Sequence, residues 1–318
     1  MAGALAGLVV AIVGGDQRER EVAWELGRQG ARVRVATGAS WAGEERRTVP
    51  WTVHDGVGPA VTGADVIIGP LAGADGQGQV WSRPQPAHPL LLSPAVLAGA
   101  AAGARLFIGN LGPPLADWAV AAGVLATDLN RLDDLALYNA IPTAEGAVAV
   151  AMAALPVTIA GVAAAILGGG RVGSTLAGLL VRMGAEATVV DRQPARRAQA
   201  ATLGCRVEPW ERLLAVLSRA QVVFNTVPAP VIADPALRSL GSGVPVIELA
   251  SAPGGVDRVA ARLLGVTVID APGLPGRVAP VTAGRYLAAV LVGLLAPRGG
   301  GCAAPAPDPD LAPARRLT

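Results

Sequence analysis

Hydrophobic and polar positions follow two alternating periods along the chain, and the whole pattern occurs twice. Residues 9–35 read VVAIVGGDQREREVAWELGRQGARVRV and residues 163–189 read AAAILGGGRVGSTLAGLLVRMGAEATV, at a constant offset of 154 residues. Each copy has an apolar run of strand length, a glycine turn, an amphipathic helical stretch, a Gly-Ala break and a second apolar run. Two such βαβ patterns predict an α/β fold with two doubly wound, Rossmann-like domains on parallel sheets.

Further short apolar runs extend each half of the chain. They lie at residues 65–68, 105–108 and 124–127 in the first half, and at 221–225, 244–249 and 266–269 in the second. We therefore expect an N-terminal Rossmann-like or flavodoxin-like domain over residues 1–150 and a second domain over residues 155–280. Ligands of such folds bind at the carboxyl ends of the strands, so we expect a cleft between the domains.

Three segments lie outside the two repeats. Residues 133–154 are helical in pattern, interrupted at Ile141-Pro142-Thr143, and are expected to link the domains. Residues 282–296 have an apolar helical pattern and are expected to pack back on the first domain. Residues 297–318 are rich in Pro, Gly and Ala, which predicts a disordered tail.

Composition narrows the classes of function. The 318 residues are 52% hydrophobic and 16% charged, with a net charge of +2 and no basic run, which argues against a nucleic-acid partner. All 26 basic residues are arginine, which excludes Schiff-base chemistry on a lysine. Cys205 and Cys302 lie far apart, and His54 and His88 lack metal-ligand spacing. We expect no metal site and no disulfide, as is typical of a reducing cytoplasm.

One uncharged stretch, from Ala147 to Gly170, is long enough to span a bilayer. Pro156 and Gly161 divide it, which favours a short apolar helix followed by a buried strand. The N-terminus has no basic segment before its apolar run and no cleavage signal. We therefore predict no membrane segment and a cytoplasmic location.

The glycine turn of the second copy has the spacing of a dinucleotide-binding motif. Gly168, Gly170 and Gly173 form G-x-G-x-x-G between a strand and a helix, which suits a pyrophosphate at the helix N-terminus. The alternative is that these glycines only make a tight turn. Asp191, 18 residues past Gly173, favours NAD through the ribose hydroxyls, whereas Arg192 offers a partner for the 2′-phosphate of NADP. The candidate cofactor-binding residues are Gly168, Gly170, Arg171, Val172, Gly173, Asp191, Arg192, Thr226, Val227 and Pro228.

The glycine turn of the first copy departs from this motif. Asp16 and Glu19 stand where the second and third glycines would be, and their carboxylates would repel a pyrophosphate. Asp16 and Arg18 still lie at the carboxyl end of a predicted strand, which indicates a substrate site. The alternative is that Asp16 only caps the helix, beside a solvated face of arginines.

Two other segments place polar residues among small ones. In YNAIPTAEG, residues 138–146, Thr143 is expected to cap a helix that begins near Glu145. In APGLPGRVAP, residues 271–280, the Pro and Gly content predicts a rigid loop beside the nicotinamide. The candidate substrate-binding residues are Asp16, Arg18, Asn139, Thr143, Gly273 and Gly276, with Glu145 as the candidate catalytic base.

Several motifs together resemble one family. They are IVGGDxR at 12–18, YNAIPTAEG at 138–146, LGGGRVG at 167–173, NTVP at 225–228, LASAPGGVD at 249–257 and APGLPGRVAPVTAG at 271–284. The chain is similar to the A subunits of the dipicolinate synthases of endospore-forming bacteria. The resemblance implies oxidation of dihydrodipicolinate to dipicolinate with NADP, partnership with a flavoprotein-like B subunit, and activity in the mother cell during sporulation. We also expect a homo-oligomer.

The resemblance is incomplete at two positions. The family commonly has an arginine where Ala252 stands and a lysine where Val281 stands. Either those contacts are dispensable in this chain, or Arg277 and Arg285 substitute for the lost charge. Two alternatives stay open: another two-domain dehydrogenase of the shikimate, alanine or 2-hydroxy acid type, or a non-catalytic subunit that senses a nucleotide. Enzymes of the shikimate type use a catalytic lysine, which this chain lacks.

Overall fold

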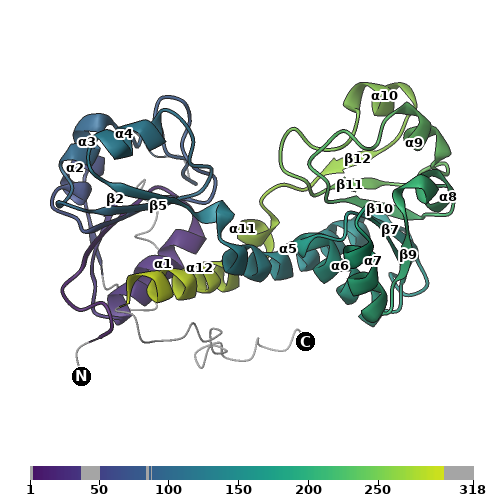
Figure 1. Ribbon diagram of the computed structural model, residues 1–318, viewed down its shortest axis with the longest axis horizontal. Helices are drawn as coiled ribbons and strands as arrows, with labels where there is room; N and C mark the ends of the chain where they lie inside the picture. The colour runs from purple at the N-terminus through teal and green to yellow at the C-terminus, as the bar shows by residue number, and fades with distance from the viewer. Residues whose placement is uncertain (1–2, 37–50, 84–85, 87, 297–318) are drawn as a thin grey trace, which may run out of the picture. The chain divides into compact units, whose positions relative to one another are not determined.

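The computed structural model describes residues 3–36, 51–83, 86 and 88–296, and the chain forms two compact units (Figure 1). Unit 1 comprises the described residues up to Leu135 together with those from Val281 onward, and unit 2 runs from Ala136 to Pro280. Each unit has a six-stranded, all-parallel sheet in the described residues, which confirms the fold class predicted from the repeat. The tail predicted over residues 297–318 lies outside the described residues.

Unit 1 has the strand order β3-β2-β1-β4-β5-β6. In Figure 1, α2, α3 and α4 cover one face of this sheet, and α1 and α12 cover the other. Its elements are β1 (Val9–Val13), α1 (Gln17–Arg28), β2 (Arg32–Ala36), β3 (Trp51–Val53), α2 (Val57–Val61), β4 (Val66–Ile68), α3 (Pro94–Ala98), β5 (Arg105–Ile108), α4 (Leu115–Ala121), β6 (Leu125–Asp128), the 3₁₀ turn η2 (Leu129–Arg131) and α12 (Pro280–Leu295).

Unit 2 has the matching order β12-β11-β10-β7-β8-β9. In Figure 1, α6 and α7 lie on one face of this sheet, and α8, α9 and α10 lie on the other. Its elements are α5 (Asp133–Ala154), β7 (Ala163–Leu167), α6 (Arg171–Arg182), β8 (Glu186–Val190), α7 (Pro194–Thr202), β9 (Arg206–Glu208), η3 (Trp210–Arg212), α8 (Leu213–Leu217), β10 (Val222–Asn225), α9 (Asp234–Ser239), β11 (Val246–Glu248), α10 (Arg258–Leu263), β12 (Val268–Asp270) and α11 (Leu274–Val278).

The sequence repeat is a structural repeat down to the strand register. Val9 pairs with Arg32 in unit 1, and Ala163 pairs with Glu186 in unit 2, each 154 residues further along. In both units the glycine after the first strand donates its N–H to the last carbonyl of the second strand, at 2.9 Å. The two glycine turns therefore start from the same backbone geometry and differ in their side chains.

The helix linking the units, α5, is continuous, so the predicted interruption at residues 141–143 is wrong. Pro142 removes one backbone hydrogen bond, but α5 continues because Ala144, Ala147 and Ala151 are buried in the core of unit 2. Most of α5 therefore belongs to unit 2, and the division falls after Leu135 and not near residue 150. By length and composition alone α5 is apolar enough to cross a membrane, and 44% of its most apolar window is buried inside the structure.

The Pro- and Gly-rich segment at residues 271–280 contains the short helix α11, so the predicted rigid loop is also wrong there. Gly273 has φ +62° before the first turn, and a proline lies within that turn, which is a common way to begin a helix. Leu274 is buried beside α5, where a Cβ at Gly146 would lie 3.0 Å from its side chain. Gly146 thus allows α11 and α5 to pack closely.

Helix α12 completes unit 1. A Cβ at Gly284 would lie 2.6 Å from the carbonyl oxygen of Arg18, so α12 packs directly on the start of α1. Arg285 forms an ion pair with Glu21 at 3.7 Å, with both side chains largely buried. Arg285, one of the two expected replacements for the missing basic residues, is therefore engaged within unit 1.

Candidate functional site

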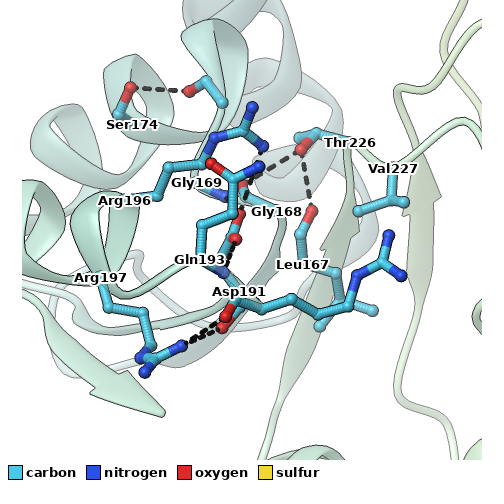
Figure 2. A network of polar contacts seen from close by, with 12 residues as sticks. Leu167, Gly168, Gly169, Ser174, Asp191, Gln193, Arg196, Arg197, Thr226 and Val227 are labelled. Atoms are coloured by element: carbon cyan, nitrogen blue, oxygen red, sulfur yellow. Dashed lines mark hydrogen bonds and ion pairs between the residues drawn. The ribbon is translucent and has the colours of Figure 1, made fainter. Parts of the chain in front are cut away.

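The glycine-rich turn of unit 2 joins β7 to α6 (Figure 2). Gly168 has φ +92°, which an L side chain rarely adopts, and a Cβ at Gly173 would collide with the carbonyl oxygen of Gly168. At Gly170 no heavy atom lies within 4 Å of the position of a Cβ. The first and third glycines are therefore required by the turn itself, whereas the second leaves open space above the backbone.

The N-terminus of α6 faces this open space. Gly170 is its N-cap residue and provides no side-chain cap for the N–H groups of the first turn. Uncapped N–H groups and the positive end of the helix dipole favour an anion. Arg171 and Val172, two of the predicted contacts, lie in the same first turn. The residues present thus fit the pyrophosphate of a dinucleotide.

The Asp191 carboxylate lies against the same turn. One oxygen accepts a hydrogen bond from Gly169 N at 2.7 Å, and the other accepts one from Gln193 N at 2.7 Å (Figure 2). The guanidinium of Arg196 lies 3.6 Å away, and Arg197 donates to the backbone carbonyl of Asp191. The side chain of Arg192 is exposed and has no ion-pair partner among the described residues.

The end of β10 closes the turn from the other side. The Thr226 hydroxyl donates to the carbonyl of Leu167 at 2.8 Å, and a Cβ at Gly168 would lie 2.9 Å from the Val227 side chain. Pro228 follows them. The fold therefore brings the predicted cofactor contacts together from the carboxyl ends of β7, β8 and β10. Because β7 lies where the strand order reverses, this is the position at which doubly wound sheets bind dinucleotides.

Two buried polar residues of unit 2 were not predicted as site residues from the sequence. Asn225 ends β10 and Glu248 ends β11, and both are buried. The signal available in the sequence was their place at the ends of apolar runs. Which face each side chain takes follows only from the strand register.

In unit 1 the equivalent helix N-terminus is already occupied by carboxylates of the chain itself. Asp16 accepts a hydrogen bond from Arg18 N at 2.9 Å, and Glu19 accepts one from Asp16 N at 2.7 Å, which forms a capping box. Helix capping by Asp16, the alternative interpretation, is therefore present. The second part of that interpretation, a solvated face of arginines, is wrong at Arg18. This side chain is only 8% exposed, because it forms two hydrogen bonds of 2.9 Å with the Asp16 carboxylate.

Glu19 is the most perturbed acid in this cluster. Its side chain is fully buried, and burial raises its pKa to about 7 in spite of the nearby Arg18 cation. Its Oε1 atom has no hydrogen-bond partner among the described residues. The cluster in unit 1 thus combines a buried ion pair with a carboxyl group that titrates near neutral pH.

The remaining substrate candidates lie on α5 and α11 in unit 2. The Oδ1 atom of Asn139 is buried without a hydrogen-bond partner in the described part of the chain. The Thr143 hydroxyl donates to the carbonyl of Asn139 at 2.6 Å and caps no helix, because α5 is continuous. Glu145 is exposed on the same helix, and Gly273 and Gly276 flank and belong to α11. Whether these residues share a cleft with Arg18 of unit 1 stays a prediction.

No group of three or more His, Cys, Asp or Glu side chains within the described ranges could hold a metal ion. Cys205 is a free, buried cysteine, and burial raises the pKa of its thiol, so it is a poor nucleophile.

Comparison with known proteins agrees with the fold and the glycine-rich turn. Residues 142–250 match the family model of the NAD-binding domain of the D-isomer specific 2-hydroxyacid dehydrogenases. A transhydrogenase from Sinorhizobium meliloti shares the fold at 19% identity and a TM-score of 0.65, over 90% of this chain and 93% of that one. Fold and site thus define a protein of two Rossmann-like units, with a domain of the NAD-binding dehydrogenase type in unit 2.

The comparisons that include unit 1 identify a particular family. Residues 9–129 match the family model of the N-terminal domain of the dipicolinate synthase A subunit. The chain is 32% identical to the A subunit of dipicolinate synthase from Bacillus subtilis over 92% of its length and 97% of that protein. The crystal structure of the corresponding protein from Bacillus halodurans has a TM-score of 0.86 and 32% identity, over 92% of this chain and 99% of that one. The chain belongs to the family of dipicolinate synthase A subunits.

Proposed function

We propose that the chain oxidises dihydrodipicolinate to dipicolinate with a nicotinamide dinucleotide. The observation that carries this proposal is the contrast between the two turns, in a chain of this family. The α6 N-terminus of unit 2 is open to a pyrophosphate, whereas the α1 N-terminus of unit 1 is closed by Asp16 and Glu19. We therefore assign the cofactor to the repeat in unit 2 and a different ligand to the repeat in unit 1.

In this proposal the cofactor, when bound, supplies the hydride acceptor. The G-x-G-x-x-G turn and the first turn of α6 hold its pyrophosphate through backbone N–H groups. Asp191 and Arg192 would hold the adenosine ribose, and residues 226–228 would lie on the nicotinamide side. The glycines supply shape and the helix N-terminus supplies positive potential.

The substrate is a small dicarboxylate, which requires hydrogen-bond donors. We assign its carboxylates to Arg18, whose guanidinium Asp16 already orients, and to the residues Asn139, Thr143, Gly273 and Gly276. A fork of N–H groups suits a carboxylate. Oxidation of the substrate also releases a proton, which Glu145 or water would accept. The gain of an aromatic ring lowers the demand on that base.

We propose NADP as the preferred acceptor. The Asp191 carboxylate is turned into the glycine-rich turn and lies beside Arg196, which offsets part of its charge. Arg192 is left exposed and available to a 2′-phosphate. The contrary interpretation is that Asp191 accepts from the ribose hydroxyls and selects NAD.

We further propose a homo-oligomer that works with the flavoprotein-like B subunit in the mother-cell cytoplasm of a sporulating bacterium. The deciding experiment is turnover of dihydrodipicolinate by the purified chain, alone and with a B subunit, followed by cofactor reduction. Reduction of cofactor with formation of dipicolinate supports the proposal. Binding of the dinucleotide without turnover in either mixture would instead indicate a nucleotide-sensing role.

A further inference from the structure

A buried pair of polar side chains joins two strand ends of unit 2. Asn225, the last residue of β10, is directly opposite Glu248, the last residue of β11, in the strand register. Asn225 Nδ2 donates to Glu248 Oε1 at 2.7 Å, with both residues at most 4% exposed. A polar pair buried this deeply costs stability unless its hydrogen bonds are complete.

The remaining hydrogen bonds of the pair define its chemical form. Glu248 Oε1 also accepts from Ala250 N at 3.2 Å, and Oε2 accepts from Gly255 N at 2.9 Å. Every partner of the carboxyl group is thus a donor, which suits an ionised carboxylate. The Asn225 amide donates to Val227 O at 3.1 Å and accepts from Val227 N at 3.2 Å, which fixes its orientation. Glu248 has no ion-pair partner among the described residues.

The pair also ties together the loops that follow β10 and β11. A Cβ at Gly255 would collide with Asn225 Nδ2, so only glycine fits there. The carbonyl of Gly255 accepts hydrogen bonds from Val231 N and Ile232 N, both at 2.9 Å. The loop after β10 and the loop after β11 are therefore held as one assembly around the Asn225–Glu248 pair.

The location of this assembly gives it a role. Dinucleotide-binding sheets consist of two mononucleotide halves, and the half that begins with the glycine-rich turn takes the adenosine side. In unit 2 this leaves β10, β11 and β12 for the nicotinamide side. The pair lies at the carboxyl end of these strands, next to Thr226, Val227 and Pro228.

We propose that Asn225 and Glu248 are positioning residues for the nicotinamide end of the cofactor, and that the uncompensated charge of Glu248 favours the oxidised form. The oxidised nicotinamide ring carries a positive charge, and the reduced ring is neutral. A buried negative charge nearby therefore stabilises the oxidised form selectively. This inference rests on the proposed function, because it assumes that unit 2 binds a nicotinamide dinucleotide.

The test compares Kd values of the oxidised and the reduced cofactor, measured by calorimetry on the full chain. In Glu248→Gln we expect the ratio of the two Kd values to shift about ten-fold toward the reduced form, because the oxidised ring loses the attraction of a nearby negative charge. General damage to the site weakens both forms and cancels in the ratio. Glu248→Asp retains the charge and should retain the wild-type ratio.

Glu186→Gln is the matched control, because it removes one carboxylate from the opposite end of the strands of the same sheet. It should leave the ratio unchanged. An unchanged ratio in Glu248→Gln would overturn the electrostatic role. If that variant does not fold, wild-type binding of the oxidised form no tighter than the reduced form would overturn it. Failure of the wild-type chain to bind either form would refute the proposed function instead.

Discussion

Gly170 of unit 2 corresponds to Asp16 of unit 1, so one substitution at Gly170 gives unit 2 the capping residue of unit 1. Gly170→Asp should cap α6 as Asp16 caps α1, and the fold should tolerate it, since Gly170 has φ −73° and open space around its Cβ. The new carboxylate would repel a pyrophosphate. We expect dinucleotide affinity to fall by at least about 100-fold in calorimetry, with the unfolding midpoint unchanged or raised.

Gly170→Asn is the control for this substitution, because asparagine has the same shape and also caps helices but carries no charge. It should lose clearly less affinity than Gly170→Asp. Equal affinities of Gly170→Asp and the wild-type chain would contradict the assignment of the turn to the cofactor.

The prediction on the choice between NADP and NAD concerns Arg192. Its side chain is exposed and free of ion pairs among the described residues, so Arg192→Ala should not affect folding. We expect kcat/KM for NADP to fall about ten-fold, the loss of one charged hydrogen bond, and kcat/KM for NAD to change little. Arg219→Ala, an equally exposed arginine at the opposite end of the strands, serves as the control. A wild-type preference for NAD would show that Asp191 determines the choice.

Glu19 predicts a pH dependence of stability. Its pKa in the folded chain is raised to about 7, so the folded state favours the neutral form. The stability that this form contributes is present below the unfolded pKa and is lost as the pH rises toward 7. Glu19→Gln retains a capping residue and stays neutral. At pH 8 we expect urea unfolding of this variant to give a free energy of unfolding about 1–3 kcal/mol above that of the wild type. At pH 5 the two free energies should differ little.

At this scale the sequence identifies residues whose role depends on the backbone and misses those whose role depends on tertiary contacts. Gly168 and Gly173 can be assigned because spacing alone fixes their conformation. Asn225 and Glu248 cannot, because their pairing depends on the register of β10 and β11. For Arg18 the sequence leaves a solvated face open as an alternative, and only the structure shows that Asp16 draws it into a buried ion pair.

Between elements, the contact of α5 with α11 depends on one missing side chain. A Cβ at Gly146 would lie 3.0 Å from Leu274 and 3.2 Å from Val278. Gly146→Val should therefore separate the two helices and destabilise unit 2 by about 1–3 kcal/mol. Gly178→Ala in α6 is the control, since its Cβ would make an ordinary 3.6 Å contact, and it should stabilise by up to about 1 kcal/mol. Thermal unfolding of both variants measures the difference.

The differences between the predicted and the observed elements have two physical causes. β3 and β9 are edge strands of three residues each, too short for an apolar run to show. The interruption expected at Pro142 is absent because burial of neighbouring alanines outweighs the lost hydrogen bond. The longer strands and both amphipathic helices of the repeat are predictable because one face of each is apolar throughout.

Across the whole molecule, the arginine assigned to the substrate and the turn assigned to the cofactor belong to different units. Arg18 belongs to unit 1 and the glycine-rich turn to unit 2. Arg18→Ala should therefore lower kcat/KM for the substrate by about 10- to 100-fold and leave the Kd of the cofactor unchanged. Arg28→Ala, on the exposed end of the same helix, should alter neither. Weakened cofactor binding in Arg18→Ala would show that the assignment of ligands to units is wrong.

The capping box of α1 also sets how many cofactor molecules one chain takes up. A duplicated nucleotide-binding fold would ordinarily offer two equivalent sites and could give binding curves with two phases. Here the carboxylates of Asp16 and Glu19 occupy one of the two positions. Because they are part of the chain, no concentration of cofactor displaces them as it would displace a free anion. Titration of this chain should therefore saturate at one dinucleotide per polypeptide, in a single phase, whatever its oligomeric state.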